Sequence, residues 1–461
     1  MNRLDRLIVV IFNLLFSTLL QASEWDIPTT QKINLNPQLF SKTNSLSTDV
    51  KTKVFDTEPS IWGVALTYRI AEIPYPTSEK TVSDVIPLLF YRKDRFFWYG
   101  LEGGYTFAKY NSWSTSLLAR YRYFDIPAEY QNTRRGNAYD LGLRYRYKKS
   151  DYLDFDIEIM NDLHERNYVN FASKFHWDAG DWDIKPYINL RWKSRKFNNY
   201  YFGLDSESPG SDFDLSIATR IRYHVHSNLY LLGQATFTMY GSDTYNSATV
   251  NRPNQSEIFL GFGFFKDKNR EQYRYLKSKP YVRIATGSAT SSNVGQIING
   301  DAESDIFNNK FTSIFYGIPV SDTFFGINLP VYLTAGYVQH HNSLVQGSFP
   351  EYVVGIKGYY TVNWPIRWRM GLAEGLSYAS KITYIEQTEM DSKGYRASNL
   401  LNYLDFTIDV DLGDLFNSKA LDNMWLGYGI HHRSGIFETS STFGRIKGGS
   451  NYTMLYLQYH W

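Results

Sequence analysis

The clearest structural signal in the chain is the segment Tyr139-Asp-Leu-Gly-Leu-Arg-Tyr-Arg-Tyr-Lys148. Its odd-numbered positions are all tyrosine or leucine, and its even-numbered positions carry Asp140, Arg144, Arg146 and Lys148. Successive side chains of a β-strand point to opposite faces of the sheet. The segment therefore predicts a strand with one apolar, aromatic face and one charged face.

The same alternation recurs along the chain, for example in residues 184–193 and 215–225. Strand-length alternating segments separated by turn residues are the signature of transmembrane β-barrels. A soluble β-sandwich alternates in a similar way, but it seldom carries so many aromatic residues on its apolar faces. Aromatic residues make up 17% of this chain, so the pattern favours an all-β fold of transmembrane antiparallel β-barrels.

Strand counting predicts two barrels in tandem. Alternation identifies about twelve strands in residues 59–265 and about eight strands in residues 280–461. The intervening residues 266–279 are too charged to lie in a bilayer wall, so we predict that they form a periplasmic linker. A single barrel of about twenty strands is the alternative architecture.

The two ends of the chain predict export to the outer membrane of a Gram-negative bacterium. Residues 1–23 combine a basic start, an apolar run and small residues suited to cleavage, which is typical of a signal peptide. The apolar run has about fourteen residues, fewer than the ~20 of a membrane-spanning helix. Residues 24–58 are polar and predict a loose periplasmic arm. The apolar alternation that ends on Trp461 resembles the signal read by the outer-membrane assembly machinery.

Charge and composition reduce the number of function classes that the chain can belong to. The net charge of +2 gives no reason to expect a nucleic-acid partner, and the absence of cysteine excludes disulfides and thiolate chemistry. No phosphate-binding loop or metal-ligand cluster stands out, so neither a cofactor nor a metal is expected, and His340-His341 is interpreted as a solvated pair. Charges that face the lumen of the first barrel are expected to pair there, because unpaired buried charges are costly. The arginines are Arg120, Arg122, Arg144, Arg146, Arg191 and Arg220, and the acids are Asp154, Asp156 and Glu158.

A second segment predicts a strand that ends in reactive side chains. Its sequence is Leu421-Asp-Asn-Met-Trp-Leu-Gly-Tyr-Gly-Ile-His-His-Arg-Ser-Gly435. The even positions from 424 to 430 form an apolar face, and His432 and Ser434 continue that face. Ionisable groups are rare on a lipid-facing surface and are functional candidates there. A base beside a hydroxyl is the core of a serine-type ester hydrolase, so we predict His432 and Ser434 as a catalytic pair.

The last strand is expected to supply the group that orients the base. Asn451 lies on the apolar face of that strand, and antiparallel neighbours lie about 4.8 Å apart, so contact between Asn451 and His432 is expected. Glu438, in the preceding loop, is an alternative partner. Backbone amides around Gly435 are the expected donors to an oxyanion.

The predicted site lies near the extracellular rim. The chain enters from the periplasm, so the seventh strand of the second barrel runs outward and places the pair beside lipid A in the outer leaflet. No cleft is expected there. Glu374, on the fifth strand, is predicted to lie two strands from His432, roughly 10 Å away, where it can contact substrate only.

Short motifs across about residues 60–265 resemble the MipA/OmpV family of outer-membrane proteins. They are Trp62-Gly-Val-Ala-Leu-Thr-Tyr68 with Pro74-Tyr75, Asp84-Val-Ile-Pro-Leu-Leu-Phe-Tyr91, Asp94-Arg-Phe-Phe97 and Tyr200-Tyr-Phe-Gly-Leu-Asp205. Pro76 stands where the family has glycine. The resemblance implies a scaffold that brings a murein transglycosylase to a murein synthase.

The second half resembles the PagL-type lipid A 3-O-deacylases, which are eight-stranded barrels. The match is Leu426-Gly-Tyr-Gly-Ile-His-His-Arg-Ser434, followed by Gly448-Gly-Ser-Asn451. It implies that His432 is the base and Ser434 the nucleophile, with Gly435 replacing the usual asparagine and Asn451 replacing the usual acid. The predicted function is therefore deacylation of lipid A in lipopolysaccharide. The alternatives are a non-enzymatic scaffold for murein-processing enzymes and a pore.

Overall fold

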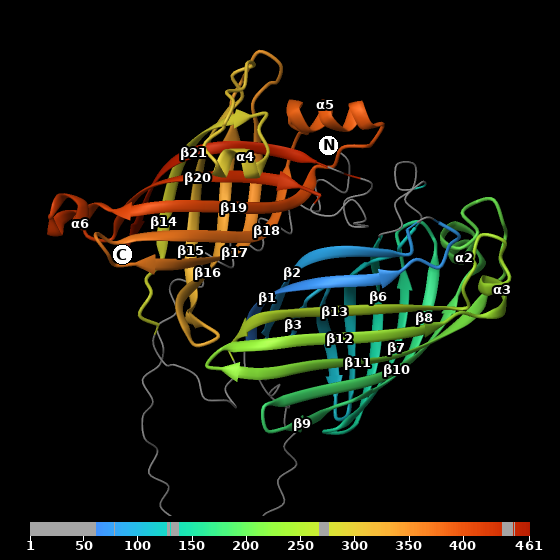
Figure 1. Ribbon diagram of the computed structural model, residues 1–461. Helices are drawn as coiled ribbons and strands as arrows, with labels where there is room; N and C mark the ends of the chain where they lie inside the picture. Colours follow the sequence, from blue (N-terminus) through green and yellow to red (C-terminus); the bar gives the residue numbers. More distant parts are fainter. Residues whose placement is uncertain are drawn as a thin grey trace, which may run out of the picture. The chain divides into compact units, whose positions relative to one another are not determined.

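The computed structural model describes residues 61–77, 79–126, 130, 138–266, 276–435, 446 and 448–461. These residues form two closed antiparallel β-barrels, drawn as two separate rings of strands in Figure 1. The predicted signal peptide and periplasmic arm, residues 1–58, lie outside the described residues. Within the described residues, no helix is both long and apolar enough to span a membrane.

The first barrel is closed by twelve strands, as the alternation predicted. Neighbouring strands follow one another along the chain, and the pairing of β10 with β11 closes the ring. The short strand β9 pairs with the first residues of β10. The strands are β1 (Ile61–Glu72), β2 (Thr81–Lys93), β3 (Phe96–Tyr99), β4 (Glu102–Tyr110), β5 (Trp113–Arg122), β6 (Ala138–Ser150), β7 (Leu153–Asn161), β8 (Asn167–Phe175), β9 (Trp177–Ala179), β10 (Trp182–Lys193), β11 (Asp212–His226), β12 (Leu229–Met239) and β13 (Asn254–Phe265). Two short helices, α2 (Arg195–Tyr201) and α3 (Ser242–Tyr245), lie in its connections.

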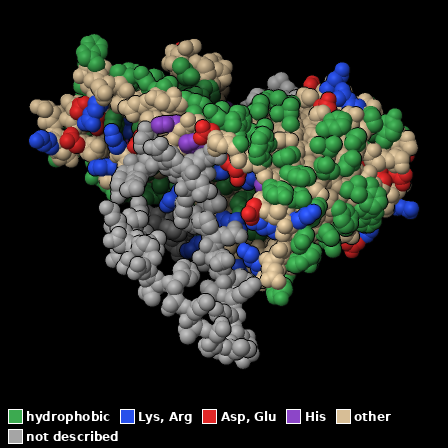
Figure 2. Space-filling model, turned by 90° about the horizontal axis from the view of Figure 1, so that it is seen from below, with side chains coloured by type: hydrophobic (Ala, Val, Ile, Leu, Met, Phe, Trp, Pro, Cys, Tyr) green, Lys and Arg blue, Asp and Glu red, His purple; other side chains and the backbone are tan. Residues whose placement is uncertain are grey.

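The two faces of the first wall separate as the sequence predicts. On β6, Leu141, Leu143 and Tyr145 point outward and are exposed, whereas Asp140 and Arg144 point into the lumen and are buried. Figure 2 shows hydrophobic side chains spread over this outer wall, with charged side chains mainly toward its ends. An apolar outer surface around a polar interior is typical of a β-barrel that is embedded in a lipid bilayer.

Charges in the first lumen pair with one another, as predicted. Arg120 contacts Glu158 at 2.7 Å and Glu102 at 2.5 Å, and Arg146 contacts Asp156 at 2.7 Å. Two of the six predicted arginines use neutral partners instead: Arg191 donates to the Asn170 side chain and Arg220 to that of Gln234.

The second barrel is closed by eight strands, so the alternative of one barrel with about twenty strands is wrong. No strand lies in residue 266 or in residues 276–280, and the rest of the predicted linker lies outside the described residues. The strands are β14 (Tyr281–Thr290), β15 (Lys310–Phe324), β16 (Ile327–His340), β17 (Phe349–Val362), β18 (Trp368–Ala379), β19 (Leu400–Asp411), β20 (Met424–Ser434) and β21 (Gly449–His460). The connections carry α4 (Val294–Ile298), α5 (Tyr384–Lys393), α6 (Leu412–Phe416) and the 3-10 turn Lys419–Leu421.

The two ends of the second barrel differ in the length of their connections. Tyr281 pairs with His460, so the first and last strands begin and end at one end, where the other connections are 325–326, 363–367 and 412–423. The opposite end carries α4 and α5, and its connections are 291–309, 341–348, 380–399 and 435–448, three of which are longer than any connection at the first end. Long connections are extracellular in barrels of this type. β20, the seventh strand, runs toward that end.

Candidate active site

Strand β20 places the predicted pair on the outer face of the second barrel. Leu426 and Tyr428 are exposed on that face, and His432 and Ser434 follow them, whereas His431 and Arg433 point into the lumen and are fully buried. The two predicted faces therefore continue to the end of the strand, although Ile430 and Ser434 on the outer face are covered.

Ser434, His432 and Asn451 form a continuous chain of hydrogen bonds. The Nε2 atom of His432 lies 2.8 Å from Ser434 Oγ, and its Nδ1 atom lies 2.6 Å from Asn451 Oδ1. Both distances are within the range of a nucleophile, a base and an orienting group in serine hydrolases. The structure thus brings together the three residues predicted from the sequence.

The hydrogen bonds of Asn451 determine which nitrogen of His432 carries the proton. Asn451 Nδ2 donates to the carbonyl oxygen of Ser292 at 2.9 Å, so its Oδ1 atom faces the imidazole as an acceptor. The Nδ1–H of His432 donates to that oxygen, and Nε2 is left with a free lone pair for the Ser434 hydroxyl. The arrangement therefore holds the imidazole in the tautomer that acts as a base.

The β20–β21 hairpin places these side chains in register. His432 lies opposite Asn451, and Ser434 lies opposite Gly449. A Cβ atom at residue 449 would lie 1.7 Å from the carbonyl oxygen of Arg433, so only glycine permits the strands to approach each other here. This close approach keeps the histidine and asparagine within hydrogen-bond distance.

A buried ion pair ties the reactive strand to α5. Arg433, which lies between His432 and Ser434 in the chain, donates to both carboxylate oxygens of Glu386 at 2.8 and 3.0 Å. Thr383 caps the start of the helix, where its side chain accepts the Glu386 N–H, and Gly394 caps the end with φ of 66°. The sequence analysis did not identify this helix, although Thr-x-x-Glu followed by a glycine is a signal for the start and end of a helix.

The other predicted site residues, Glu374, Gly435 and Glu438, do not belong to the hydrogen-bonded triad. Glu374 pairs with Leu404, which pairs with His432, so Glu374 lies in the same row two strands away, as predicted. Its Oε1 atom is buried and has no hydrogen-bond partner among the described residues. The N–H of Gly435 donates to the Gly448 carbonyl at 3.4 Å, and Glu438 lies outside the described residues.

The outer surface around Ser434 is more sheltered than the sequence predicted. Ser434 is only 8% exposed, and α4, from the β14–β15 connection, packs against β20. Ile446, in the β20–β21 connection, is buried against Met390 of α5 and Leu401. Residues of three connections therefore cover the end of β20, while the described residues around Ser434 line no cavity.

His340 is also placed differently from its interpretation as a solvated residue. It is fully buried in the lumen, and its Nε2 atom lies 2.7 Å from the carboxylate of Glu351. In the described part of the chain, no group of three or more histidine or acidic side chains is arranged to hold a metal ion.

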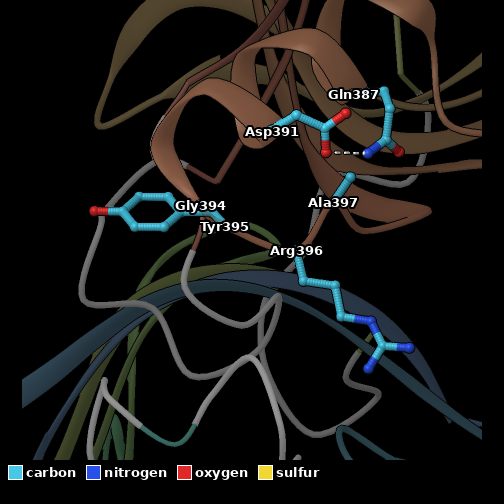
Figure 3. A pocket seen from close by; sticks show the side chains of 6 residues that line it. All are labelled: Gln387, Asp391, Gly394, Tyr395, Arg396 and Ala397. Carbon is cyan, nitrogen blue, oxygen red and sulfur yellow. Dashed lines mark hydrogen bonds between the residues drawn. The ribbon is translucent and has the colours of Figure 1, made fainter.

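A cavity of about 420 Å³ lies at the C-terminal end of α5 (Figure 3). Gln387 and Asp391 face each other on the helix, joined by a hydrogen bond of 2.7 Å, and the chain then turns along the cavity. Its described lining residues are Gln387, Asp391, Gly394, Tyr395, Arg396 and Ala397, and they do not include His432, Ser434 or Asn451. The hydrogen-bonded triad is therefore separate from this cavity.

Two closed barrels with an apolar outer wall define an outer-membrane β-barrel protein. The first barrel matches a known family: residues 64–265 fit the model described as "MltA-interacting protein MipA". This is the family that the motifs of the first half resemble.

Two relatives of known name support the outer-membrane location. One is outer membrane protein Omp26La of Vibrio anguillarum, 29% identical over 111 residues. The other is outer membrane protein OmpV of Vibrio cholerae, 28% identical over 111 residues. Each match covers 22% of this chain and only 42% of the relative. The protein is therefore placed in the outer membrane of a Gram-negative bacterium.

Several solved outer-membrane proteins cover most of the chain at low similarity. The channel DcaP of Acinetobacter baumannii has a TM-score of 0.20 and 9% identity, covering 87% of this chain and 96% of that one. OprB of Pseudomonas putida has a TM-score of 0.23 and 7% identity, covering 87% and 94%. Scores this low carry no argument about function.

Proposed function

We propose that the second barrel hydrolyses an ester-linked acyl chain of lipid A, most simply the chain at the 3 position. The observation that carries this proposal is the hydrogen-bonded series Ser434–His432–Asn451 on the outer face near the extracellular end. A structural role alone does not require a base and a hydroxyl on the lipid-facing side of a strand. In the outer leaflet, such a pair meets the acyl esters of lipopolysaccharide without leaving the membrane.

The reaction follows from the roles of the three side chains. Ser434 Oγ attacks the ester carbonyl carbon while His432 Nε2 takes the hydroxyl proton, and the carbonyl electron pair moves onto oxygen. Collapse of this intermediate breaks the ester C–O bond, and the leaving lipid alkoxide takes the proton from His432. Water then hydrolyses the acyl-serine by the same steps and releases a fatty acid. Asn451 keeps the imidazole correctly oriented throughout.

Glu374 and Gly435 are proposed to contact the substrate. The row that joins Glu374 to His432 runs across the outer face of β18, β19 and β20, so a lipid bound at Ser434 passes over Leu404 toward Glu374. The unpartnered Oε1 atom of Glu374 is available to a hydroxyl or amide N–H of the lipid. Glu438 is not required for this assignment.

Ser434→Ala is expected to abolish the activity, because it removes the attacking atom. The measurement is mass spectrometry of lipid A from Gram-negative cells that express the wild type, Ser434→Ala or Ser288→Ala. Ser288 is a matched control because it is an exposed serine on the outer face of β14. Lipid A from cells that express the wild type or Ser288→Ala should lack one hydroxyacyl chain, and lipid A from cells that express Ser434→Ala should keep it. Unchanged lipid A with a folded wild type, judged by gel mobility with and without boiling, would contradict the proposal.

Replacing Asn451 tests whether an acceptor at this position orients the base. Asn451→Leu removes the acceptor for His432 Nδ1–H and is expected to lower the rate by about 10²–10⁴, since a wrong tautomer can cost ~10⁴. Asn451→Glu supplies a carboxylate in the place of the family's acid and should preserve or raise the rate. Thr453→Val, two residues along the same face, is the control. Equal rates for the two Asn451 variants would show that this residue does not act on His432.

A scaffold function for the first barrel is the second candidate, and the family match of residues 64–265 favours it. The family's description names an interaction with MltA, so the proposed partners are murein-processing enzymes. Unchanged lipid A in the experiment on Ser434 would leave this as the better proposal. Co-purification of such an enzyme with the full chain, abolished by substitutions in the first barrel, would support it directly.

A further inference from the structure

The backbone amides nearest to Ser434 are already engaged in hydrogen bonds. The N–H of Gly435 donates to the carbonyl of Gly448 at 3.4 Å, and the N–H of Gly449 donates to Glu389 Oε2 at 2.9 Å. An oxyanion formed on an ester bound to Ser434 needs a donor about 2.7–3.1 Å away. Within the described residues, the expected amide at Gly435 would have to break its own bond to serve.

A side-chain amide lies on the other side of the nucleophile. Asn402 on β19 is the direct cross-strand partner of Ser434 on β20. Cross-strand partners on one face have Cβ atoms roughly 4.5–5.5 Å apart, so the Asn402 amide can reach an oxygen bound to the carbon that Ser434 attacks. Ser434 is thus flanked by Asn402 on β19 and by Gly449 on β21, the last strand.

The Asn402 side chain is buried without being satisfied. The residue is 2% exposed, and its Oδ1 atom has no hydrogen-bond partner among the described residues. Leaving a buried polar group without a hydrogen bond is unfavourable. Because no bond holds Oδ1, the amide can rotate about its last torsion and present its N–H₂ group.

We propose that Asn402 is a catalytic residue whose side-chain N–H stabilises the oxyanion of the tetrahedral intermediate. The inference rests on the proposed ester hydrolysis by Ser434. When Ser434 Oγ bonds to the carbonyl carbon and its proton passes to His432, the former carbonyl oxygen gains the electron pair and accepts a hydrogen bond from Asn402. The same bond forms again during attack by water on the acyl-serine. Asn402 thus completes the site from β19, while Asn451 acts from β21.

The test uses the purified full chain in detergent micelles containing lipid A, with released fatty acid as the readout. Asn402→Leu keeps a similar volume but has no donor, and kcat should fall by about 10²–10³ with little change in KM. Asn402→Asp is isosteric and places a negative charge against the oxyanion, so it should lower kcat at least as much. Asn328→Leu, at an exposed asparagine of β16, is the matched control and should hydrolyse at the wild-type rate.

Thermal stability separates catalysis from a structural role. Asn402→Leu removes an unsatisfied polar group, so its Tm should equal or exceed that of the wild type while its activity falls. Loss of activity in proportion to loss of folded protein, with Asn402→Asp folded and fully active, would overturn the inference. Full activity of a folded Asn402→Leu protein would also overturn it and would leave the hydrolase proposal standing. An inactive wild type would refute both.

Discussion

His432→Ala is expected to lower the rate of ester hydrolysis by about 10⁴–10⁶ while leaving the barrel folded. The imidazole is the only described group within hydrogen-bond distance of Ser434 Oγ that can take its proton, since its Nε2 atom lies 2.8 Å away. Without a base, the Ser434 hydroxyl is a weak nucleophile at neutral pH. The loss should be about as large as that of Ser434→Ala, because base and nucleophile act as a unit.

The measurement is the rate of fatty-acid release by purified protein at a saturating concentration of lipid A. His341→Ala is a matched control, because this histidine follows β16 and is absent from the hydrogen-bonded triad. The double variant His432→Ala and Ser434→Ala should be no slower than either single variant. Losses that multiplied would show that the two side chains act separately and would contradict the proposed mechanism.

Glu351→Leu is expected to destabilise the second barrel by about 3–5 kcal/mol, the cost of removing one partner from a buried ionic network. Glu351 is fully buried, and one of its carboxylate oxygens accepts from His431 Nε2 at 3.0 Å and Ser377 Oγ at 2.7 Å. Its other oxygen accepts from His340 at 2.7 Å. Replacement by leucine leaves these donors and the nearby Arg433 without their acceptor in the lumen.

Glu374→Leu is the matched control for this substitution. The same change at Glu374 removes a carboxyl whose Oε1 atom has no described partner, so stability should stay within about 1 kcal/mol of the wild type or rise. The measurement is the urea concentration at which the folded, fast-migrating species is half lost on gels of unboiled samples. Equal midpoints for Glu351→Leu and Glu374→Leu would contradict the importance of the buried network.

The buried network also explains how the reactive side chains are held in place. His431 and Arg433 alternate with His432 and Ser434 along β20, so each reactive residue is adjacent to one anchored in the lumen. Arg433 links this anchoring to α5 through Glu386, and Glu386 also accepts from Ser450 Oγ on β21 at 2.6 Å. The lumen bonds therefore hold both strands of the hairpin that carries the triad.

The sequence alone was sufficient for the barrel class, the strand number and the two faces of each strand. These properties follow from a period of two residues, which is local and can be recognised within ten residues, as in residues 139–148. The pairing of His432 with Asn451 was predictable for the same reason, because a hairpin sets the register of neighbouring strands.

The shelter over Ser434, the anchoring of β20 to α5 and the position of Asn402 beside the nucleophile appear only in the tertiary structure. Asn402 and Ser434 are placed together by the register of β19 and β20, which are joined by a connection containing α6. Arg433 and Glu386 are 47 residues apart, and no periodic pattern relates them. Local alternation determines which face a side chain occupies. The register of the closed barrel and the folding of its long connections determine which distant side chains meet there.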